Sequence, residues 1–256
     1  MRHFSALPRF AFMLCAMGLY LTSSALARPL SGERVQVSAP CLSSLHVVTD
    51  NALSAAVDVR GTEPAGLQST TAADGTITLS LPTCPAGQSL ELHTPSAMPL
   101  AIDSPQATRI VIDDRSGPMS IHAGSGALDT GKTGQIDLAT ESSGPIHIGR
   151  LGGSARLRST TSAPITVDQA DAPALAVYLA GTASLSVPEG TLKALDINNT
   201  GKGNANFGGT TGVAALHVQG EGSITVRRAT GTLATERDGK GHINVNQPQT
   251  TPTQQN

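Results

Sequence analysis

The chain has 256 residues, of which 39% are hydrophobic and only 2% aromatic, and its formal net charge is −2. Nucleic acids and anionic membranes select clustered Lys and Arg, whereas the charges here are few and dispersed. The composition therefore argues against a nucleic-acid partner and against an anionic membrane surface.

Residues 1–27 have the three parts of a secretory signal peptide. The basic Arg2 and Arg9 precede an apolar run over residues 10–21, and Ala25-Leu26-Ala27 forms an A-x-A cleavage site. The apolar run is too short to remain as a membrane anchor. We therefore expect an exported mature chain, periplasmic or extracellular at the cell surface, without a transmembrane anchor.

Removal of residues 1–27 leaves 15 basic residues against 19 acidic ones, a net charge of −4, and leaves Tyr178 and Phe207 as the only aromatic residues. It also leaves two cysteines, Cys41 and Cys84. An even number of cysteines in an exported chain predicts a disulfide, here closing a loop of about 43 residues. Two unrelated buried thiols are the alternative.

Residues 28–98 contain short apolar–polar–apolar segments at irregular spacing. The tripeptide Ala73-Asp74-Gly75 before Thr76 is a hairpin signal. We interpret this region as a β-rich, disulfide-tied N-terminal cap. A solenoid over 99–246 follows, in which 124–134 carries little apolar content and is expected to be a loop or a degenerate rung.

One short phrase returns six times from residue 144 onward. It occurs as Gly144-Pro-Ile-His-Ile148, Ala163-Pro-Ile-Thr-Val167, Ala183-Ser-Leu-Ser-Val187, Gly203-Asn-Ala-Asn-Phe207, Gly222-Ser-Ile-Thr-Val226 and Gly241-His-Ile-Asn-Val245. The phrases are almost evenly spaced, and a second series of short strands lies halfway between them. A period of about 20 residues with two strands is typical of a solenoid, in which stacked rungs build a continuous core.

Side chains alternate between the two faces of a strand, so the apolar residues of each phrase point inward and the middle residue points outward. The first outward row is predicted to contain His147, Thr166, Ser186, Asn206, Thr225 and Asn244. The second is predicted to contain Arg156, Ala176, Asp196 and His217. An antiparallel meander is the rival interpretation, whereas helical repeats are excluded because no window has helical apolar periodicity.

The order of these features resembles a known bacterial family. A Cys-bearing strand, irregular strands, the segment Ala73-Asp-Gly-Thr-Ile-Thr-Leu79 and repeated Gly-x-Ile-x-Val phrases are similar to the domains of unknown function grouped as putative auto-transporter adhesin, head-GIN-like β-helices. The resemblance covers about residues 33–246. It implies an all-β fold, a right-handed single-stranded parallel β-helix, in an exported protein, with rungs of about 20 residues each. The family carries no established catalytic residues to transfer.

Few residues suggest chemistry. Asp113-Asp114 is an adjacent acidic pair, but neighbours in a strand point to opposite faces, and the following Arg115-Ser-Gly-Pro118 indicates a solvated corner. Glycoside hydrolysis needs two carboxylates facing one groove. Tyr178 is expected outward, one rung from Arg158, where the guanidinium could stack on the ring.

Asp196 and His217 are expected at equivalent outward places on neighbouring rungs, which is the reach of an ion pair or of half a metal site. No third ligand is evident beside them. We therefore assign no catalytic, cofactor or metal residues, and retain Tyr178, Arg158, Asp196 and His217 as outward-face contacts.

The sequence favours a non-enzymatic structural or binding protein of the bacterial cell envelope, adhesin-like, whose partner is an envelope protein or a glycan. The alternative is a carbohydrate-active β-helix enzyme, a polysaccharide lyase or hydrolase. Residues 247–256 form a polar tail that we expect to be disordered. Its prolines, with Arg237, Asp238 and Lys240 nearby, blunt the last strand edge and predict a monomer.

Overall fold

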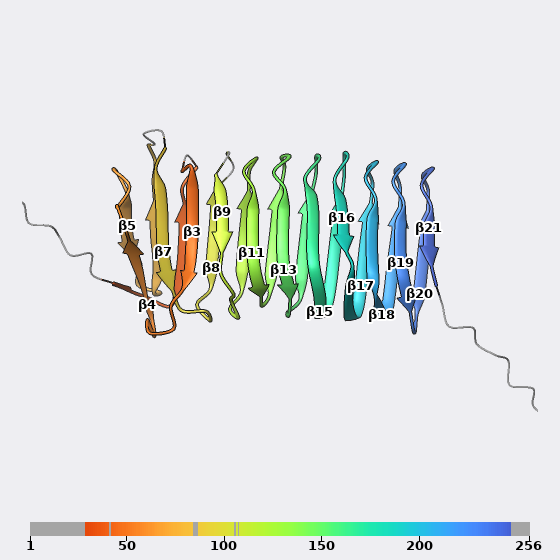
Figure 1. Ribbon diagram of the computed structural model, residues 1–256, viewed down its shortest axis with the longest axis horizontal. Helices are drawn as coiled ribbons and strands as arrows, with labels where there is room; N and C mark the ends of the chain where they lie inside the picture. The colour runs from red at the N-terminus through yellow and green to blue at the C-terminus, as the bar shows by residue number, and fades with distance from the viewer. Residues whose placement is uncertain (1–28, 41, 84–86, 105, 107, 247–256) are drawn as a thin grey trace, which may run out of the picture.

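The computed structural model describes residues 29–40, 42–83, 87–104, 106 and 108–246, and these form a parallel β-solenoid (Figure 1). The all-β solenoid predicted from the repeats is confirmed, and the antiparallel meander is excluded over the regular rungs. No helix in the described part of the chain is long and apolar enough to span a membrane. Cys41 and Cys84 lie outside the described residues, so the disulfide stays a prediction.

Each rung contributes strands to two ladders, which form the two broad sides of the solenoid. Ladder 1 contains, in spatial order, β6 (Thr76–Ser80), β2 (Arg34–Ser38), β8 (Leu100–Ser104), β10 (Met119–Ala123), β12 (Ile136–Thr140), β14 (Ala155–Ser159), the end of β15 (Pro164–Leu179), β17 (Glu189–Asn199), the end of β18 (Ala205–Val218) and β20 (Leu233–Arg237).

Ladder 2 is built in the same way from the alternate strands. It contains β7 (Ser89–Thr94), β3 (Ser44–Thr49), β9 (Arg109–Ile112), β11 (Leu128–Thr133), β13 (Ile146–Leu151), the start of β15, β16 (Ser184–Val187), the start of β18, β19 (Ile224–Ala229) and β21 (Ile243–Val245). From β8 onward, paired residues lie 17 to 20 positions apart.

The core is a stack of aliphatic residues from the inward faces of both ladders. Ile146, Ile165 and Leu185 occupy one inward position on successive rungs of ladder 2, and each is at most 2% exposed. Phe207 is equally buried, as its inward position predicts. The outward row predicted from His147 to Asn244 is confirmed residue for residue.

The expectation for residues 124–134 is only partly correct. This stretch contains the full strand β11, whose inward positions are Leu128, Thr130 and Thr133. Two buried threonines in apolar places explain the missing hydrophobic pattern. β11 pairs with β9 on one side and β13 on the other, so the neighbouring rungs hold it in strand conformation.

Close backbone contacts explain why four of the six repeated phrases begin with glycine. A Cβ atom on Gly203 would lie 1.8 Å from the carbonyl oxygen of Ala183, and one on Gly222 or Gly241 would lie 1.9 or 2.0 Å from the glycine oxygen one rung below. Backbones stacked this closely exclude any side chain. At the same corner, the buried Asn199 donates to the Gly203 carbonyl at 2.7 Å and accepts from the Gly201 N–H at 3.1 Å.

The first strands in sequence are not the first in space. After β2 and β3, the chain moves outward to β4 (Ala56–Arg60) and β5 (Gln68–Thr71), which pair antiparallel with β7 and β6. The strands β6 and β7 then lie on the outer side of β2 and β3, and β8 and β9 lie on their inner side. Figure 1 shows β4, β5 and β7 beyond β3 at this end. Residues 30–94 thus combine stacked rungs with antiparallel end strands.

Arg115 fixes the crossover between β7 and β8. Its side chain is only 2% exposed, and its guanidinium donates to the Thr94 hydroxyl, to the Pro95 carbonyl at 3.1 Å and to the Met98 carbonyl at 2.5 Å. Burial lowers the pKa of Arg115 to about 10, so the group remains charged at neutral pH. The solvated corner predicted here is therefore wrong for Arg115, which fills the space beneath the turn.

Candidate functional site: the outer face of ladder 1

The outer face of ladder 1 is a continuous surface with few long side chains. Two outward rows follow from the pairing of its strands. Alanine recurs in them, as Ala101, Ala139, Ala176, Ala215 and Ala234. Between the longer side chains, these small residues leave shallow hollows of about 410 Å³ beside His122 and about 360 Å³ near the C-terminal end of the ladder.

The middle of this face carries an aromatic–cation pair. Arg158 is the register partner of Tyr178, and its guanidinium carbon lies 5.3 Å from the centre of the ring. The structure thus brings together the two residues that the sequence placed on neighbouring rungs. Arg156, two residues before Arg158 and on the same face, lies 3.8 Å from Asp137 and is largely exposed. The patch thus contains a half-buried ring with a guanidinium over one face, and a second cation that lies near Asp137.

The structure does not pair Asp196 with His217. Asp196 lies opposite Ala215, and His217 lies opposite Asn198, two residues further along the strand. The predicted alignment of these two rungs was wrong by two residues. Ala214 and Leu216 both point inward, so a shift of two residues leaves His217 on the correct face and changes only its partner on the neighbouring strand. Both residues still line the same 360 Å³ hollow.

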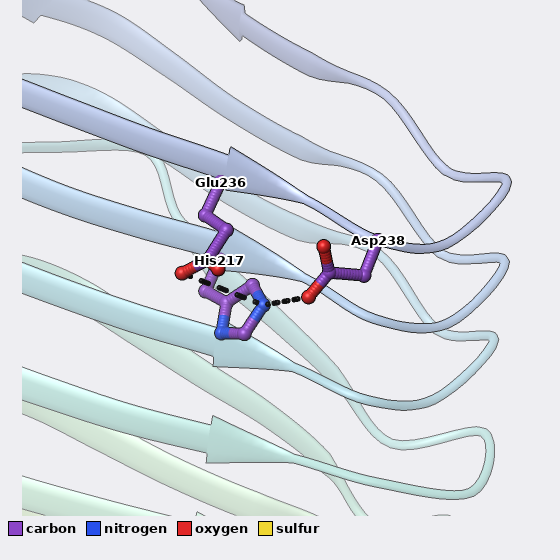
Figure 2. A group of neighbouring side chains, drawn as sticks. All are labelled: His217, Glu236 and Asp238. Carbon is purple, nitrogen blue, oxygen red and sulfur yellow. Dashed lines mark hydrogen bonds and ion pairs between the residues drawn. The ribbon is translucent and has the colours of Figure 1, made fainter.

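The partners of His217 come from the last strand of the ladder. Its Nε2 lies 3.0 Å from a carboxylate oxygen of Asp238 and 3.9 Å from one of Glu236, as Figure 2 shows. Glu236 is the register partner of His217, and Asp238 follows directly after β20. The separation of His217 from Glu236 in the sequence equals one repeat, and this is the signal that could have identified the group.

Other outward histidines also contact carboxylates on neighbouring rungs. His122 lies 3.0 Å from Asp103 on ladder 1, and on ladder 2 the Nδ1 of His147 lies 2.9 Å from Asp129 and its Nε2 lies 3.0 Å from Asp168. The hydrogen bond that His147 donates to Asp129, followed by the one that it donates to Asp168, raises the pKa of His147 above its ordinary value of 6.5. These contacts link successive rungs along both faces.

The two acidic residues considered for catalysis take part in hydrogen bonds at a corner. Asp113 accepts from the Thr49 N–H at 3.2 Å and lies 3.3 Å from His46, while Asp114 accepts from the Lys132 N–H at 2.7 Å. These contacts tie the β3, β9 and β11 rungs together. The geometry gives both carboxylates a part in corner structure.

One family model matches the C-terminal rungs of the chain. Residues 136–248 match the sequence profile of the family described as "Putative auto-transporter adhesin, head GIN domain", which confirms over this region the resemblance predicted from the repeats. No curated protein matches the chain.

Two crystal structures share the fold. The chain is similar to a putative lipid binding protein from Parabacteroides distasonis, with 14% identity, a TM-score of 0.58 and coverage of 86% of this chain and 96% of that one. It is also similar to a putative adhesin from Bacteroides fragilis, with 12% identity, a TM-score of 0.51 and the same coverage. At these identities the likeness extends to the fold.

Proposed function

We propose that this chain is an exported, non-enzymatic adhesin-like protein of the bacterial cell envelope, because residues 136–248 match the putative auto-transporter adhesin, head GIN domain family. Its ligand in this proposal is an extended glycan that carries carboxylate groups and lies on the outer face of ladder 1. Export is supported by the signal-peptide pattern of residues 1–27.

The observation that carries the proposal is the pair of the exposed Arg158 and the half-buried Tyr178 in the middle of this face. An aromatic ring presents an apolar face to a sugar ring, and a guanidinium donates two parallel hydrogen bonds to a carboxylate. Arg156 adds a second cation on the next outward position of the same strand. The hydroxyl of Thr200 donates to the Tyr178 hydroxyl at 3.4 Å, which helps to fix the ring from the following rung.

The flatness of the face favours an extended ligand over a compact one. The hollows on ladder 1 are shallow and follow one another along the solenoid axis, on either side of the Arg158–Tyr178 pair. Rungs repeat about every 4.8 Å, so a linear polymer can meet equivalent positions on several of them. Affinity would then come from many weak contacts around one central anchor.

A glycan array of acidic and neutral polysaccharides tests this proposal. We expect the wild-type protein to bind acidic glycans, and the double variant Arg158→Ala, Tyr178→Ala to bind at least about tenfold more weakly, since each cation–π or charged contact contributes about 1 kcal/mol. The control is Thr166→Ala, Thr225→Ala, which removes outward side chains of ladder 2 and should leave binding unchanged.

Two results would overturn the proposal. Equal binding by the wild type and the Arg158 and Tyr178 variant would remove the site from ladder 1. Release of new reducing ends or unsaturated sugars from any bound polysaccharide would instead favour the carbohydrate-active enzyme. N-terminal sequencing of protein recovered from the periplasm or the medium tests export separately, with cleavage after Ala27 as the expected result.

A further inference from the structure

We propose that His217, Glu236 and Asp238 form a binding site for a divalent transition-metal ion of the zinc class. One nitrogen or oxygen atom from each residue could bind the ion, and these three atoms all lie within 4.8 Å of one another. Among the described residues, this is the group of three that meets the criterion. Figure 2 shows that both carboxylates approach the same ring nitrogen. The sequence analysis considered His217 only with Asp196, as half a metal site, and did not point to Glu236 or Asp238.

The distances fit the ligand shell of such an ion. Zinc–nitrogen and zinc–oxygen bonds of about 2.0–2.1 Å place two ligands of a tetrahedral site about 3.4 Å apart. The Nε2 of His217 lies 3.0 Å from Asp238 and 3.9 Å from Glu236, so the observed separations lie on either side of that value. Small rotations of the two exposed carboxylates are enough to admit the ion.

The backbone holds the ligands in place before any ion binds. Glu236 is the direct neighbour of His217 across the β18–β20 pairing. The N–H of Asp238 donates to the Val218 carbonyl at 2.9 Å, which fixes the turn that carries the third ligand. The site therefore needs side-chain adjustment and no rearrangement of the chain.

A neighbouring amide can set the protonation of the imidazole. Gln219 lies 3.4 Å from the Nδ1 of His217 on the side away from the carboxylates. The atom in contact is the amide nitrogen, which donates to Nδ1. Rotation of the amide by 180° lets its oxygen accept from Nδ1–H instead, and the lone pair of Nε2 then faces the two carboxylates. A second polar partner of this kind is usual for histidines that bind metals.

His147 shows why the residue types alone do not suffice. It also has two aspartates within 3.0 Å, but Asp129 contacts Nδ1 and Asp168 contacts Nε2, so the carboxylates lie on opposite sides of the ring. A single ion cannot contact all three. His147 thus offers a matched control with the same chemistry and a different geometry.

The ligand set also selects the kind of ion. Imidazole with carboxylates suits Zn²⁺ and related transition metals, whereas Ca²⁺ takes six to eight oxygen ligands. Three protein ligands leave at least one coordination position for water or for a group from a bound partner. The acidic Asp196, on the rim of the adjoining hollow, adds negative charge beside the site.

Binding would clamp the last strand of ladder 1. β20 pairs with β18 on one side, and four of its five residues are exposed. An ion held by His217 on β18 and by Glu236 and Asp238 on and after β20 joins these two rungs through their side chains. The metal would therefore stabilise the C-terminal end more than any other part of the solenoid.

Isothermal titration of ZnCl₂ into tag-free, full-length protein tests the site. We expect one saturable site per chain in the wild type and in His147→Ala, and no saturable binding in His217→Ala or in the isosteric Asp238→Asn. Absence of saturable binding in the wild type, or undiminished binding in both His217→Ala and Asp238→Asn, would overturn the proposal.

Hydrogen exchange distinguishes an ion that joins β18 to β20 from an ion bound non-specifically at the surface. Zn²⁺ at 100 times its Kd should slow exchange of the β20 amides by up to about 100-fold, because opening of this strand must release the ion. The Asp238→Asn variant should show no such change. Equal slowing in both proteins, or slowing of strands remote from β20 only, would contradict the clamp.

Discussion

The two ends of the solenoid differ in how their outermost strands are protected from pairing with further strands. A stack of parallel strands leaves unpaired backbone groups at each end, which can template further strands. At the N-terminal end the chain reverses, and β4 and β5 run antiparallel over β7 and β6. At the C-terminal end β20 and β21 are the last strands of their ladders in the described residues. One end is covered by the chain itself, and at the other no strand of the described residues lies beyond β20 and β21.

Charged side chains reinforce the covered end. Arg60 on β4 contacts Asp58 at 2.7 Å and Asp50 at 2.8 Å, and the buried His93 on β7 lies 2.8 Å from Glu91. The Arg60–Asp50 contact joins β4 to the end of β3, whereas the other two contacts each lie within one strand. Both ends leave apolar side chains only partly buried against the core: Leu30, Val59 and Leu67 at the covered end, and Leu233, Ile243 and Val245 at the open end. The antiparallel strands β4 and β5 therefore cover the N-terminal end, and charge pairs within and next to these strands add to the cover.

The largest expected loss of stability comes from the core in the middle of the solenoid, with which the effects at both ends can be compared. Ile165→Asp should lower the free energy of unfolding by about 4 kcal/mol or more, since it places an unpaired charge among residues at most 2% exposed. Thr166→Asp, one residue along and outward, should change it by less than about 0.5 kcal/mol. Urea denaturation followed by circular dichroism measures both, and equal midpoints would contradict the assignment of faces.

A disulfide between Cys41 and Cys84 would strengthen the covered end. In the entropic account, closing a loop of about 43 residues contributes about 4 kcal/mol. We expect denatured, non-reduced protein from the export compartment to contain no titratable thiol, and reduction to speed exchange most in the N-terminal rungs. Two free thiols in that material would mean that the cysteines are separate.

Arg115→Ala should weaken the covered end by about 3 kcal/mol, because the Thr94 hydroxyl and the carbonyls of Pro95 and Met98 lose their buried donor. Hydrogen exchange should accelerate in β7 and β8 and remain unchanged in β19 and β21. The control Arg156→Ala removes an exposed guanidinium and should have an effect below about 0.5 kcal/mol. Matching losses from both substitutions would show that burial of Arg115 contributes nothing specific.

The open end should associate once its charge and tail are removed. Deletion of residues 247–256 combined with Arg237→Thr leaves β20 and β21 accessible to a second copy, while the parent should stay monomeric. Light scattering over a concentration series compares the two proteins. A variant as monomeric as the parent would mean that features other than the tail and Arg237 protect this edge.

The smallest expected effect concerns pH. Contacts with Asp129 and Asp168 raise the pKa of His147 above 6.5 in the folded protein. Folding therefore favours the protonated form of His147. The stabilisation is fully present below about pH 6.5 and is lost as the pH rises through the folded-state value. Because the group is largely exposed, we expect His147→Ala to lose only about 0.3 kcal/mol more at pH 5.5 than at pH 9.

The control for this measurement is Thr166→Ala, in the same outward row, whose effect should not depend on pH. A difference of the opposite sign would show that the contacts with Asp129 and Asp168 do not govern the titration. His147 can contact carboxylates on both sides because it lies on an interior rung. His217, next to the last rung, finds both of its carboxylates on one side.

Sequence periodicity predicts most of the regular rungs. The alternation around Ile146, Ile165 and Leu185 identifies the core, and the outward rows follow from it because the strand period is two. The same period explains the error at His217, since a shift of two residues preserves every face. Pairing of Arg158 with Tyr178 was predictable because the repeat runs between their rungs without an irregularity in register.

The order of the N-terminal strands and the contacts of Arg115 and His217 could not be predicted from local sequence patterns. The irregular spacing before residue 99 reflects strands inserted out of sequence order, and no local signal states that β6 and β7 pack outside β2 and β3. Arg115 looked like part of an exposed turn because its three neutral acceptors lie 17 to 21 residues earlier, on the preceding rung. The two carboxylates near His217 were missed because β20 lacks the usual apolar pattern.

The placement of β2 and β3 between two later rungs has a consequence for the order of folding. Only β1 (Leu30–Ser31) precedes these strands in the chain, yet one edge of each stays unpaired until β6 and β7 form and the other until β8 and β9 form. The first rung is therefore completed only after about 110 residues have emerged. From β10 onward each new strand meets a finished template, so one slow nucleation step is followed by rapid growth toward the C-terminus.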